Sequence, residues 1–253
     1  MTRIGIIGGS GLDDPDILQN VRELDVDTAF GKPSSSLKIG TIGETEVVLL
    51  ARHGRDHTCP PSQVNYRANV RALFDQACDC VLATTAVGSL REEIDRGHLV
   101  ILDQFIDFTR HRAVTFHEVF ECRSPVHTPM ADPFDEGLRG LLIDACKRLD
   151  VTHHERGTVI TIEGPRFSTR AESHMFRAWG ADVINMSIAP ECALANEIGL
   201  PYAAVAMSTD YDCWKMDENP VTWDDILRIF NQNAEKVTAV LKDAIGRYLP
   251  EKD

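Results

Sequence analysis

Two aspartates two positions apart, Asp210 and Asp212, follow an apolar segment at residues 201–207. Small and β-branched residues that end in hydroxyls and carboxylates are typical of a buried strand, and open α/β sheets bind ligands at the carboxyl ends of such strands. On a continuing strand the two carboxyls would share a face, where their repulsion favours one bound proton near neutral pH. A protonated carboxyl can donate a hydrogen bond to a heterocyclic nitrogen. A solvated turn with two ordinary acids is the alternative interpretation.

Two further strand ends lie upstream. Residues 158–162 lead into a turn that contains Phe167, and residues 181–186 end at Met186 and Ser187. An aromatic face, a thioether and carboxylates together suit a flat, nitrogen-rich base joined to a sugar. Taken singly, Phe167 and Met186 are equally typical of core packing.

A glycine-rich turn at residues 8–11 follows the first apolar segment, residues 3–7. Backbone N–H groups in such a turn can approach an anion, and the Ser10 hydroxyl can add a hydrogen bond. A dinucleotide fingerprint is excluded because Asp14 stands where the third glycine is required. A phosphate-binding P-loop is excluded as well, since no Gly-Lys-Ser/Thr follows. A small-anion loop or a plain tight turn remains.

Two more strand ends carry groups that suit phosphate. Residues 46–51 end at Arg52 and His53, and residues 81–85 end at Thr85, before a glycine turn. The planar guanidinium of Arg52 offers a bidentate donor to phosphate. The alternatives are a basic surface loop for Arg52 and a hydroxyl bonded to its own backbone for Thr85.

The elements that would position these groups are short apolar strands between amphipathic helices, which predicts an α/β fold. We expect a hairpin of residues 39–42 with 46–51, and helices at residues 66–77, 134–149, 171–179 and 221–249. A chain of 253 residues can bury one large core, either as one domain or as two closely packed halves.

The net charge of −13 argues against nucleic acid or an anionic membrane as the main partner. The first residues lack the apolar core of a signal peptide, and no apolar run approaches the roughly 20 residues that span a bilayer. We therefore expect a cytoplasmic protein.

The seven cysteines form an odd number without a small-domain disulfide spacing, which favours reduced thiols. Cys78 and Cys80 have no second pair of metal-binding residues nearby. His111, His117 and His127 lie in a loop at residues 109–129 without a spacing that would place them on one helix face. We expect no metal site.

Long stretches of the chain resemble the S-methyl-5′-thioadenosine phosphorylases of the trimeric purine nucleoside phosphorylase family. The resemblance rests on EGPRFSTRAES, MFRAWGADVINMS, APE and MSTDYDCWK and extends from Arg3 to about Gly246. It implies a single domain over residues 1–253, a three-layer sandwich whose mixed, mainly parallel, twisted central sheet is flanked by helices. It also implies a homotrimer, or possibly a hexamer, that needs no metal or organic cofactor and uses inorganic phosphate as co-substrate.

The same resemblance implies roles for individual residues. Those that would hold phosphate are Ser10, Arg52, His53, Thr85, Ala86 and Ser187. Those that would contact the nucleoside are Phe167, Met186, Asp210, Tyr211, Asp212, His57 near the 5′ side of the sugar, and His127 reaching into a neighbouring subunit. Specificity would depend on Ser168, Asp212 and Trp223, the last of which replaces a small aliphatic residue of relatives.

The implied reaction is reversible phosphorolysis of S-methyl-5′-thioadenosine to adenine and 5-methylthioribose 1-phosphate, a step of methionine and purine salvage that recycles a by-product of polyamine synthesis. Asp210 would be the catalytic acid at N7, and Asp212 would accept from the 6-amino group. The alternatives are a 6-oxopurine nucleoside or S-methyl-5′-thioinosine phosphorylase, a nucleosidase that uses water, and a non-catalytic nucleotide-binding module.

Overall fold

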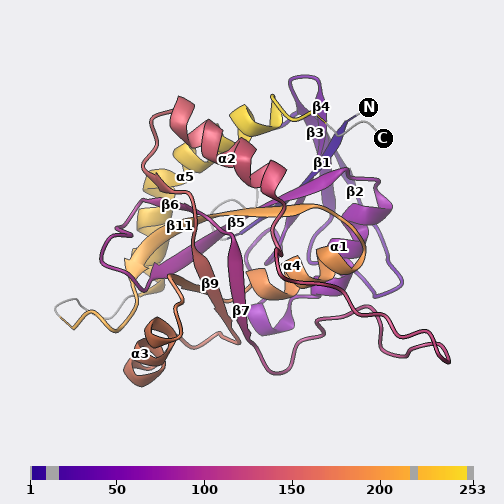
Figure 1. Cartoon of the computed structure of the whole chain (residues 1–253). Helices are drawn as coiled ribbons and strands as arrows, with labels where there is room; N and C mark the ends of the chain where they lie inside the picture. The colour runs from indigo at the N-terminus through magenta and orange to yellow at the C-terminus, as the bar shows by residue number, and fades with distance from the viewer. Residues whose placement is uncertain (1, 10–16, 217–221, 250–253) are drawn as a thin grey trace.

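The computed structural model describes residues 2–9, 17–216 and 222–249. Within these ranges, eleven strands form one sheet in the order β2-β3-β4-β1-β5-β10-β9-β7, with β11 paired to β5 and β6, and β8 paired to β6 (Figure 1). The strands are β1 Arg3–Gly8, β2 Gln19–Leu24, β3 Leu37–Ile42, β4 Thr45–Ala51, β5 Cys80–Ser89, β6 Leu99–Ile101, β7 Gln104–Phe108, β8 His153–His154, β9 Thr158–Ile162, β10 Val183–Asn185 and β11 Tyr202–Tyr211.

Most strand pairs are parallel, and β5 is the centre of the sheet because it pairs with β1, β10 and β11. The antiparallel pairs are β2 with β3, β3 with β4, β5 with β10, and β6 with β11. The β3–β4 pair is the predicted hairpin. The mixed, mainly parallel sheet predicted from the sequence is therefore confirmed.

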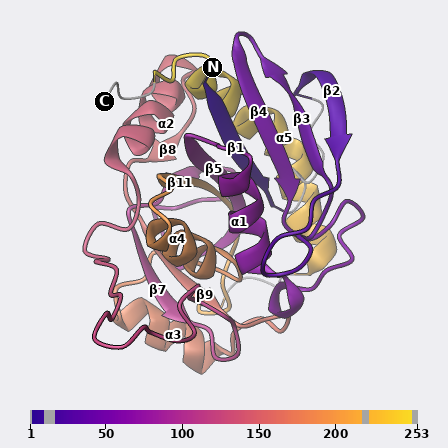
Figure 2. The same ribbon diagram turned by 90° about the vertical axis from the view of Figure 1, so that its right-hand side faces the viewer.

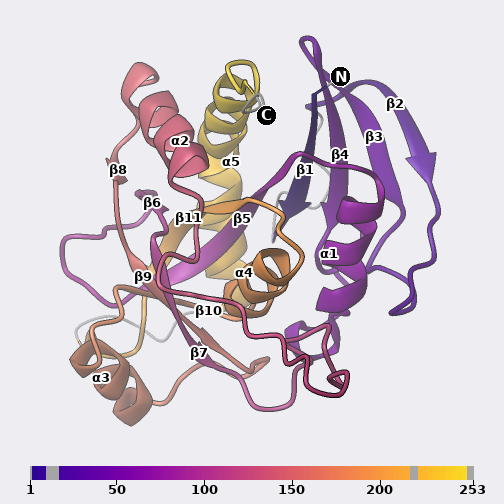
Figure 3. The same ribbon diagram turned by 45° about the vertical axis from the view of Figure 1, so that its right-hand side comes forward.

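Helices cover both faces of the sheet. Figures 1 and 3 show α2 and α5 together on one side and α1 and α4 on the other, and Figure 2 shows α1 beside α4. The helices are α1 Tyr66–Asp75, α2 Glu136–Arg148, α3 Arg170–Ala178, α4 Ile188–Glu197 and α5 Trp223–Ile245, with a 3₁₀ turn at Pro61–Gln63. The result is the predicted three-layer α/β sandwich.

The alternation of side chains along each strand divides the core between the two faces. Ile6 and Leu82 pack in the cluster with α2 and α5, whereas Ile7 and Ala83, one position further along, pack in the cluster with α1 and α4. The strands are apolar at consecutive positions because both faces are covered.

The expectation of a glycine turn after residues 81–85 is wrong, because β5 continues to Ser89. Gly88 is instead a place of close approach. A Cβ there would lie 3.1 Å from Ile184 Cγ2 and 3.3 Å from Asp210 Oδ2. A glycine inside a strand often marks such an approach rather than a turn.

Two of the predicted helices end two or more residues earlier than expected, and the other two end one residue earlier. The predicted helix 66–77 ends at Asp75, and Ala77 has φ of +54° and is exposed. Val221 lies outside the described residues, and α5 ends at Ile245 rather than at 249. The predicted loop at residues 109–129 is confirmed as part of a connection between β7 and α2, which extends away from the body at the lower right of Figure 1.

Candidate active site

A cavity of about 420 Å³ opens at the carboxyl ends of β4, β5, β9, β10 and β11. Apolar strands that end in polar residues meet at this edge of the sheet, as expected for a ligand site in an α/β protein. Its lining residues are Arg52, His53, His57, Thr58, Cys59, Pro60, Pro61, Thr85, Ala86, Val87, Gly88, Ile162, Pro165, Phe167, Ser168, Ile184, Asn185, Met186, Ser187, Thr209, Asp210 and Asp212. Half of these are residues that the sequence analysis proposed for the site.

Arg52 at the end of β4 is buried and paired with the equally buried Glu191 of α4. Its Nε and Nη2 donate to the two carboxylate oxygens, with Nη2 at 2.8 Å, and its Nη1 donates to the carbonyl of Thr84 at 2.8 Å. The Tyr202 hydroxyl donates to the same carboxylate at 2.9 Å. Burial alone would lower the pKa of Arg52, but the charge and hydrogen bonds of Glu191 raise it above its usual value, so the guanidinium stays charged.

His53, which follows Arg52, is a neutral imidazole in the folded protein. Burial, and next the charge of Arg52, lower the pKa of His53 to about 3. Its Nδ1 lies 2.9 Å from the Cys59 carbonyl oxygen, which can only accept, so Nδ1 carries the proton. Nε2 is therefore left as a hydrogen-bond acceptor. The His57 ring lies beside it, with ring centroids 4.6 Å apart.

The Thr85 hydroxyl is oriented by a buried amide. Asn185 Nδ2 donates to Thr85 Oγ1 at 3.2 Å, and Asn185 Oδ1 accepts from the Thr161 hydroxyl at 2.8 Å. Because Thr85 Oγ1 accepts from Asn185, the hydroxyl proton must point toward a different partner. In this structure the hydroxyl donates to the Ala86 carbonyl at 3.1 Å. A ligand oxygen can replace that weak local bond.

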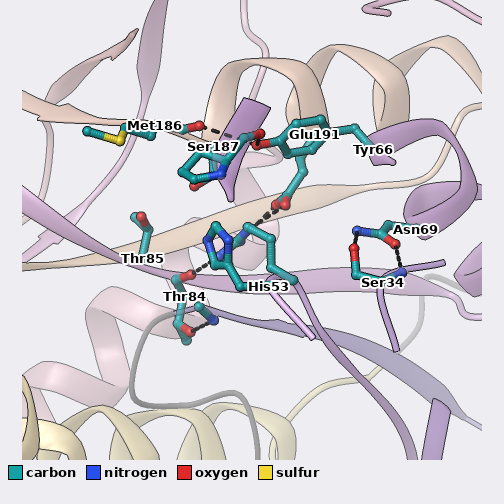
Figure 4. A network of polar contacts seen from close by, with 12 residues as sticks. Ser34, His53, Tyr66, Asn69, Thr84, Thr85, Met186, Ser187 and Glu191 are labelled. Atoms are coloured by element: carbon teal, nitrogen blue, oxygen red, sulfur yellow. Dashed lines mark hydrogen bonds and ion pairs between the residues drawn. The ribbon is translucent and has the colours of Figure 1, made fainter. Parts of the chain in front are cut away.

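Ser187 precedes α4, and its side chain makes no capping hydrogen bond to the helix. Its hydroxyl therefore remains available at a helix N-terminus, where backbone N–H groups favour an anion. Figure 4 shows Ser187 and Met186 with His53 and Thr85 in one group. The charged guanidinium of Arg52, the N-terminus of α4 and the hydroxyls of Thr85 and Ser187 can together hold a tetrahedral anion.

On the other side of the cavity, the Ser168 hydroxyl lies 2.7 Å from both carboxylate oxygens of Asp212. Asp210 Oδ1 accepts from the Thr209 hydroxyl at 2.7 Å. Ser168 is fixed because the next residue, Thr169, caps α3 in a reciprocal capping box with Glu172. Two carboxylates beside an aromatic ring at the rim, Phe167, can hold a nitrogen-rich base.

Tyr211 is the predicted site residue that the structure places elsewhere. Its hydroxyl lies 3.1 Å from the Glu92 carbonyl and 3.1 Å from Asp95 Oδ1, away from the cavity. Because side chains alternate along a strand, Tyr211 points to the face opposite that of Asp210 and Asp212, which line the cavity. Substrate contact through its side chain is therefore not supported.

Three further predicted residues are not among the described residues that line the cavity. His127 is exposed in the β7–α2 connection, so a contribution to a neighbouring subunit stays a prediction. Ser10 lies outside the described residues. Trp223 begins α5, but its side chain is not among those described.

The sequence analysis missed the buried partners of the predicted residues, chiefly Glu191 and Asn185. Glu191 stands in an otherwise apolar segment, residues 188–195, and charged residues are almost never fully buried without a partner. That contrast was a usable signal for a buried ion pair. Asn185 gave no comparable signal.

An anion subsite beside a carboxylate-lined base subsite, at one edge of an α/β sheet, defines a protein built to bind a nucleoside together with an oxyanion. Residues 3–246 match the sequence model of the Phosphorylase superfamily. The chain belongs to this family, and the resemblance stated from the sequence is confirmed.

Similar proteins include several S-methyl-5′-thioadenosine phosphorylases. The chain is 55% identical to the one from Xenopus tropicalis over 96% of its own length and 88% of the relative, and 54% identical to that from Danio rerio over the same shares. A methylthioadenosine phosphorylase from Schistosoma mansoni in complex with adenine superposes with a TM-score of 0.93 at 43% identity, over 97% of this chain and 91% of that one.

No group of three or more His, Cys, Asp or Glu side chains in residues 2–9, 17–216 and 222–249 is arranged to bind a metal ion. No helix in the same ranges is long and apolar enough to cross a bilayer.

Proposed function

We propose that the protein is a pentosyltransferase that catalyses reversible phosphorolysis of S-methyl-5′-thioadenosine to adenine and 5-methylthioribose 1-phosphate, in methionine and purine salvage. The observation that carries the proposal is one cavity that is lined both by Arg52, His53 and Thr85 and by Asp210 and Asp212. Relatives that are 46–55% identical over nearly the whole chain carry that name, which supports the same activity here.

In the proposed reaction, a phosphate oxygen attacks C1′ of the sugar as the bond from C1′ to N9 of the purine breaks. The bonding electrons pass to the purine, and a protonated Asp210 donates its proton at N7. General-acid catalysis of this kind contributes on the order of 10²–10⁴-fold. The phosphate would be held in line with the C1′–N9 bond by Arg52, Thr85, Ala86 and Ser187, and by Ser10, which lies outside the described residues. His53 Nε2, an acceptor, would receive a hydrogen bond from a protonated phosphate oxygen. Positioning of the two reactants supplies much of the remaining acceleration.

Base selectivity would come from the pair of Ser168 and Asp212. The Ser168 hydroxyl donates to the Asp212 carboxyl group, which would accept from the 6-amino group of adenine. A 6-oxopurine would place an acceptor against that acceptor, at a cost on the order of 1–3 kcal/mol. Phe167 would lie against the base and Met186 against the ribose, with His57 near the 5′ side.

Phosphate-dependent cleavage of 5′-methylthioadenosine, measured beside 5′-methylthioinosine, adenosine and inosine, tests the proposal. We expect the adenine substrates alone to react, and only with phosphate. Preference for the inosines would contradict the role of Asp212 and favour a 6-oxopurine phosphorylase, and cleavage without phosphate would indicate a nucleosidase. Binding without turnover of any of the four would indicate a non-catalytic module. Asp210→Asn should reduce turnover by the general-acid factor, and Asp212→Asn should weaken discrimination against the inosines.

The assembly and location are further parts of the proposal. We propose a homotrimer in which His127 reaches the cavity of a neighbouring subunit, which sedimentation of the protein and the kinetics of His127→Ala would test. An active monomer would contradict it. The unpaired cysteines fit the reducing cytoplasm that we propose as its location. Neither a metal nor an organic cofactor enters the proposed reaction.

A further inference from the structure

The guanidinium of Arg112, in the β7–α2 connection, lies behind the wall of the cavity. Only 2% of its side chain is exposed. Its Nη1 donates to the Met186 carbonyl at 2.5 Å and to the Tyr66 hydroxyl at 2.9 Å, and its Nη2 donates to the carbonyls of Ile162 at 3.2 Å and Glu163 at 2.6 Å. Its Nε donates to the Glu163 carboxylate at 3.2 Å.

These acceptors lie at the carboxyl ends of two neighbouring parallel strands. Ile162 ends β9 and Met186 follows β10, and both side chains line the cavity. Ile162 is also in register with Phe108 of β7, and the Met186 carbonyl also accepts from the Tyr66 hydroxyl at 3.3 Å. Buried carbonyls without a donor are costly, and here one planar group supplies donors to both strands.

The arginine is itself held in place by the connection that carries it. The Glu163 carboxylate accepts from the backbone N–H groups of Arg110 at 2.6 Å and His111 at 3.1 Å, in addition to Arg112. Further along the connection, the Glu197 carboxylate at the end of α4 accepts from the Phe116 N–H at 2.7 Å. The guanidinium therefore has a fixed position from which to order the strand ends.

A second buried arginine provides a comparison. Arg139 of α2 donates to the carbonyls of Leu102 at 2.9 Å and Glu155 at 2.6 Å, and it pairs with the exposed Glu136. Its burial and partners resemble those of Arg112, but none of its partners lines the cavity. Any effect that arises only from the loss of a buried arginine should appear at both positions.

We propose that Arg112 is a positioning residue for the nucleoside half of the cavity. Arg112 ties the ends of β9 and β10 together. Met186 and the turn that bears Phe167 and Ser168 are thereby held facing Asp210 and Asp212. Of the groups assigned to phosphate, Arg52, His53 and Thr85 come from β4 and β5, whereas Ser187 directly follows the Met186 carbonyl that Arg112 holds. Arg112 acts through other residues and does not touch the ligand. That the ligand is a purine nucleoside rests on the proposed function.

Equilibrium binding of 5′-methylthioadenosine and, separately, of inorganic phosphate to Arg112→Met by titration calorimetry tests this assignment. We expect the nucleoside Kd to rise roughly 10- to 100-fold, because small misplacements in a site have effects of this size. The phosphate Kd should rise less, since Ser187 is the one named phosphate-binding residue that directly follows a carbonyl held by Arg112. Arg139→Met, matched in burial, should lower the melting temperature without changing either Kd. An unchanged nucleoside Kd in Arg112→Met, or an equal rise in Arg139→Met, would overturn the proposal.

Two further variants keep the test decisive where Arg112→Met does not fold. Arg112→Lys keeps the charge but cannot reach both strand ends with a planar fork, so we expect it to bind nucleoside weakly, and full affinity would show that charge alone suffices. Glu163→Gln keeps the shape but weakens the hold on Arg112, so a smaller rise in the same Kd is expected, and no rise would count against the proposal. Because binding is measured without turnover, an enzyme that binds the nucleoside but does not cleave it would refute the proposed function and leave this inference standing.

Discussion

Replacement of Glu191 by glutamine leaves the Arg52 guanidinium buried with its charge uncompensated. The variant keeps the shape of the side chain, but of the strong partners only the Thr84 carbonyl remains fully intact. Removal of one partner of a buried ion pair costs about 3–5 kcal/mol. For a chain of this length, each kcal/mol lowers the melting temperature by about 2–4 °C. We therefore expect the melting temperature of Glu191→Gln to fall by roughly 6–20 °C.

Phosphate should compensate for part of this loss, because its negative charge takes the place of the missing carboxylate beside Arg52. The rise in melting temperature on addition of phosphate should thus be larger for Glu191→Gln than for the unchanged protein, as ligand binding to the folded state stabilises it. Scanning calorimetry with and without phosphate measures both effects. If phosphate stabilises the two proteins equally, Arg52 does not face the anion and the argument fails.

Glu136→Gln is the matched control, since Glu136 also pairs with a buried arginine, Arg139, but has a 72% exposed side chain. Exposed ion pairs contribute about 0–1 kcal/mol, so its melting temperature should change little. The double variant Arg52→Met with Glu191→Leu removes both charges and should recover most of the stability without phosphate binding. A Glu191→Gln protein as stable as the control would refute the coupling of these two charges.

Three other outcomes follow from the site. Burial lowers the pKa of His53 to about 3 in the folded protein. Between pH 6.5 and 3 the unfolded chain therefore binds the extra proton, and the free energy of unfolding falls by up to about 1.4 kcal/mol for each pH unit of acidification. Urea unfolding of His53→Asn between pH 6.5 and 4.5 should show a smaller fall in this free energy, and the same pH dependence in both proteins would contradict the burial argument. Tyr211→Phe should keep kcat/KM within about twofold of the unchanged protein, since the Tyr211 hydroxyl is hydrogen-bonded outside the cavity. A tenfold loss of kcat/KM would show that Tyr211 does contribute to the site. Gly88→Ala places a Cβ 3.3 Å from Asp210 Oδ2 and should reduce kcat more than the affinity for phosphate, whereas an equal change in both would show a general disturbance of β5.

The α/β class and the groups at the strand ends were predictable because apolar runs followed by polar residues are a local pattern, whereas the three-layer sandwich and the mainly parallel sheet were implied by the family resemblance. The strand ends meet at one edge of the sheet, where the cavity is lined by Arg52, His53, Thr85, Asp210 and Asp212. The roles of these residues remain predictions, since geometry places side chains together without showing what they bind.

Features that depend on distant partners could not be predicted. Gly88 has the local appearance of a turn, and only the closeness of Asp210 on β11 explains it as a strand residue. The direction of Tyr211 was predictable, by contrast, because strand alternation places it opposite its neighbours Asp210 and Asp212. Glu191 lies 139 positions from Arg52, so their pairing exists only in the folded chain.

The central strand β5 passes both halves of the cavity, with Thr85 on the anion side and Gly88 beside the two aspartates. These residues are three positions apart, which corresponds to about 10 Å along an extended strand. A strand that is paired on both sides cannot lengthen or shorten, so the separation between the two subsites is constant. Synthetic ligands that join a phosphate mimic to an adenine-like ring should therefore be selected by linker length, and linkers that hold the two groups at this separation without free rotation would lose the least entropy on binding.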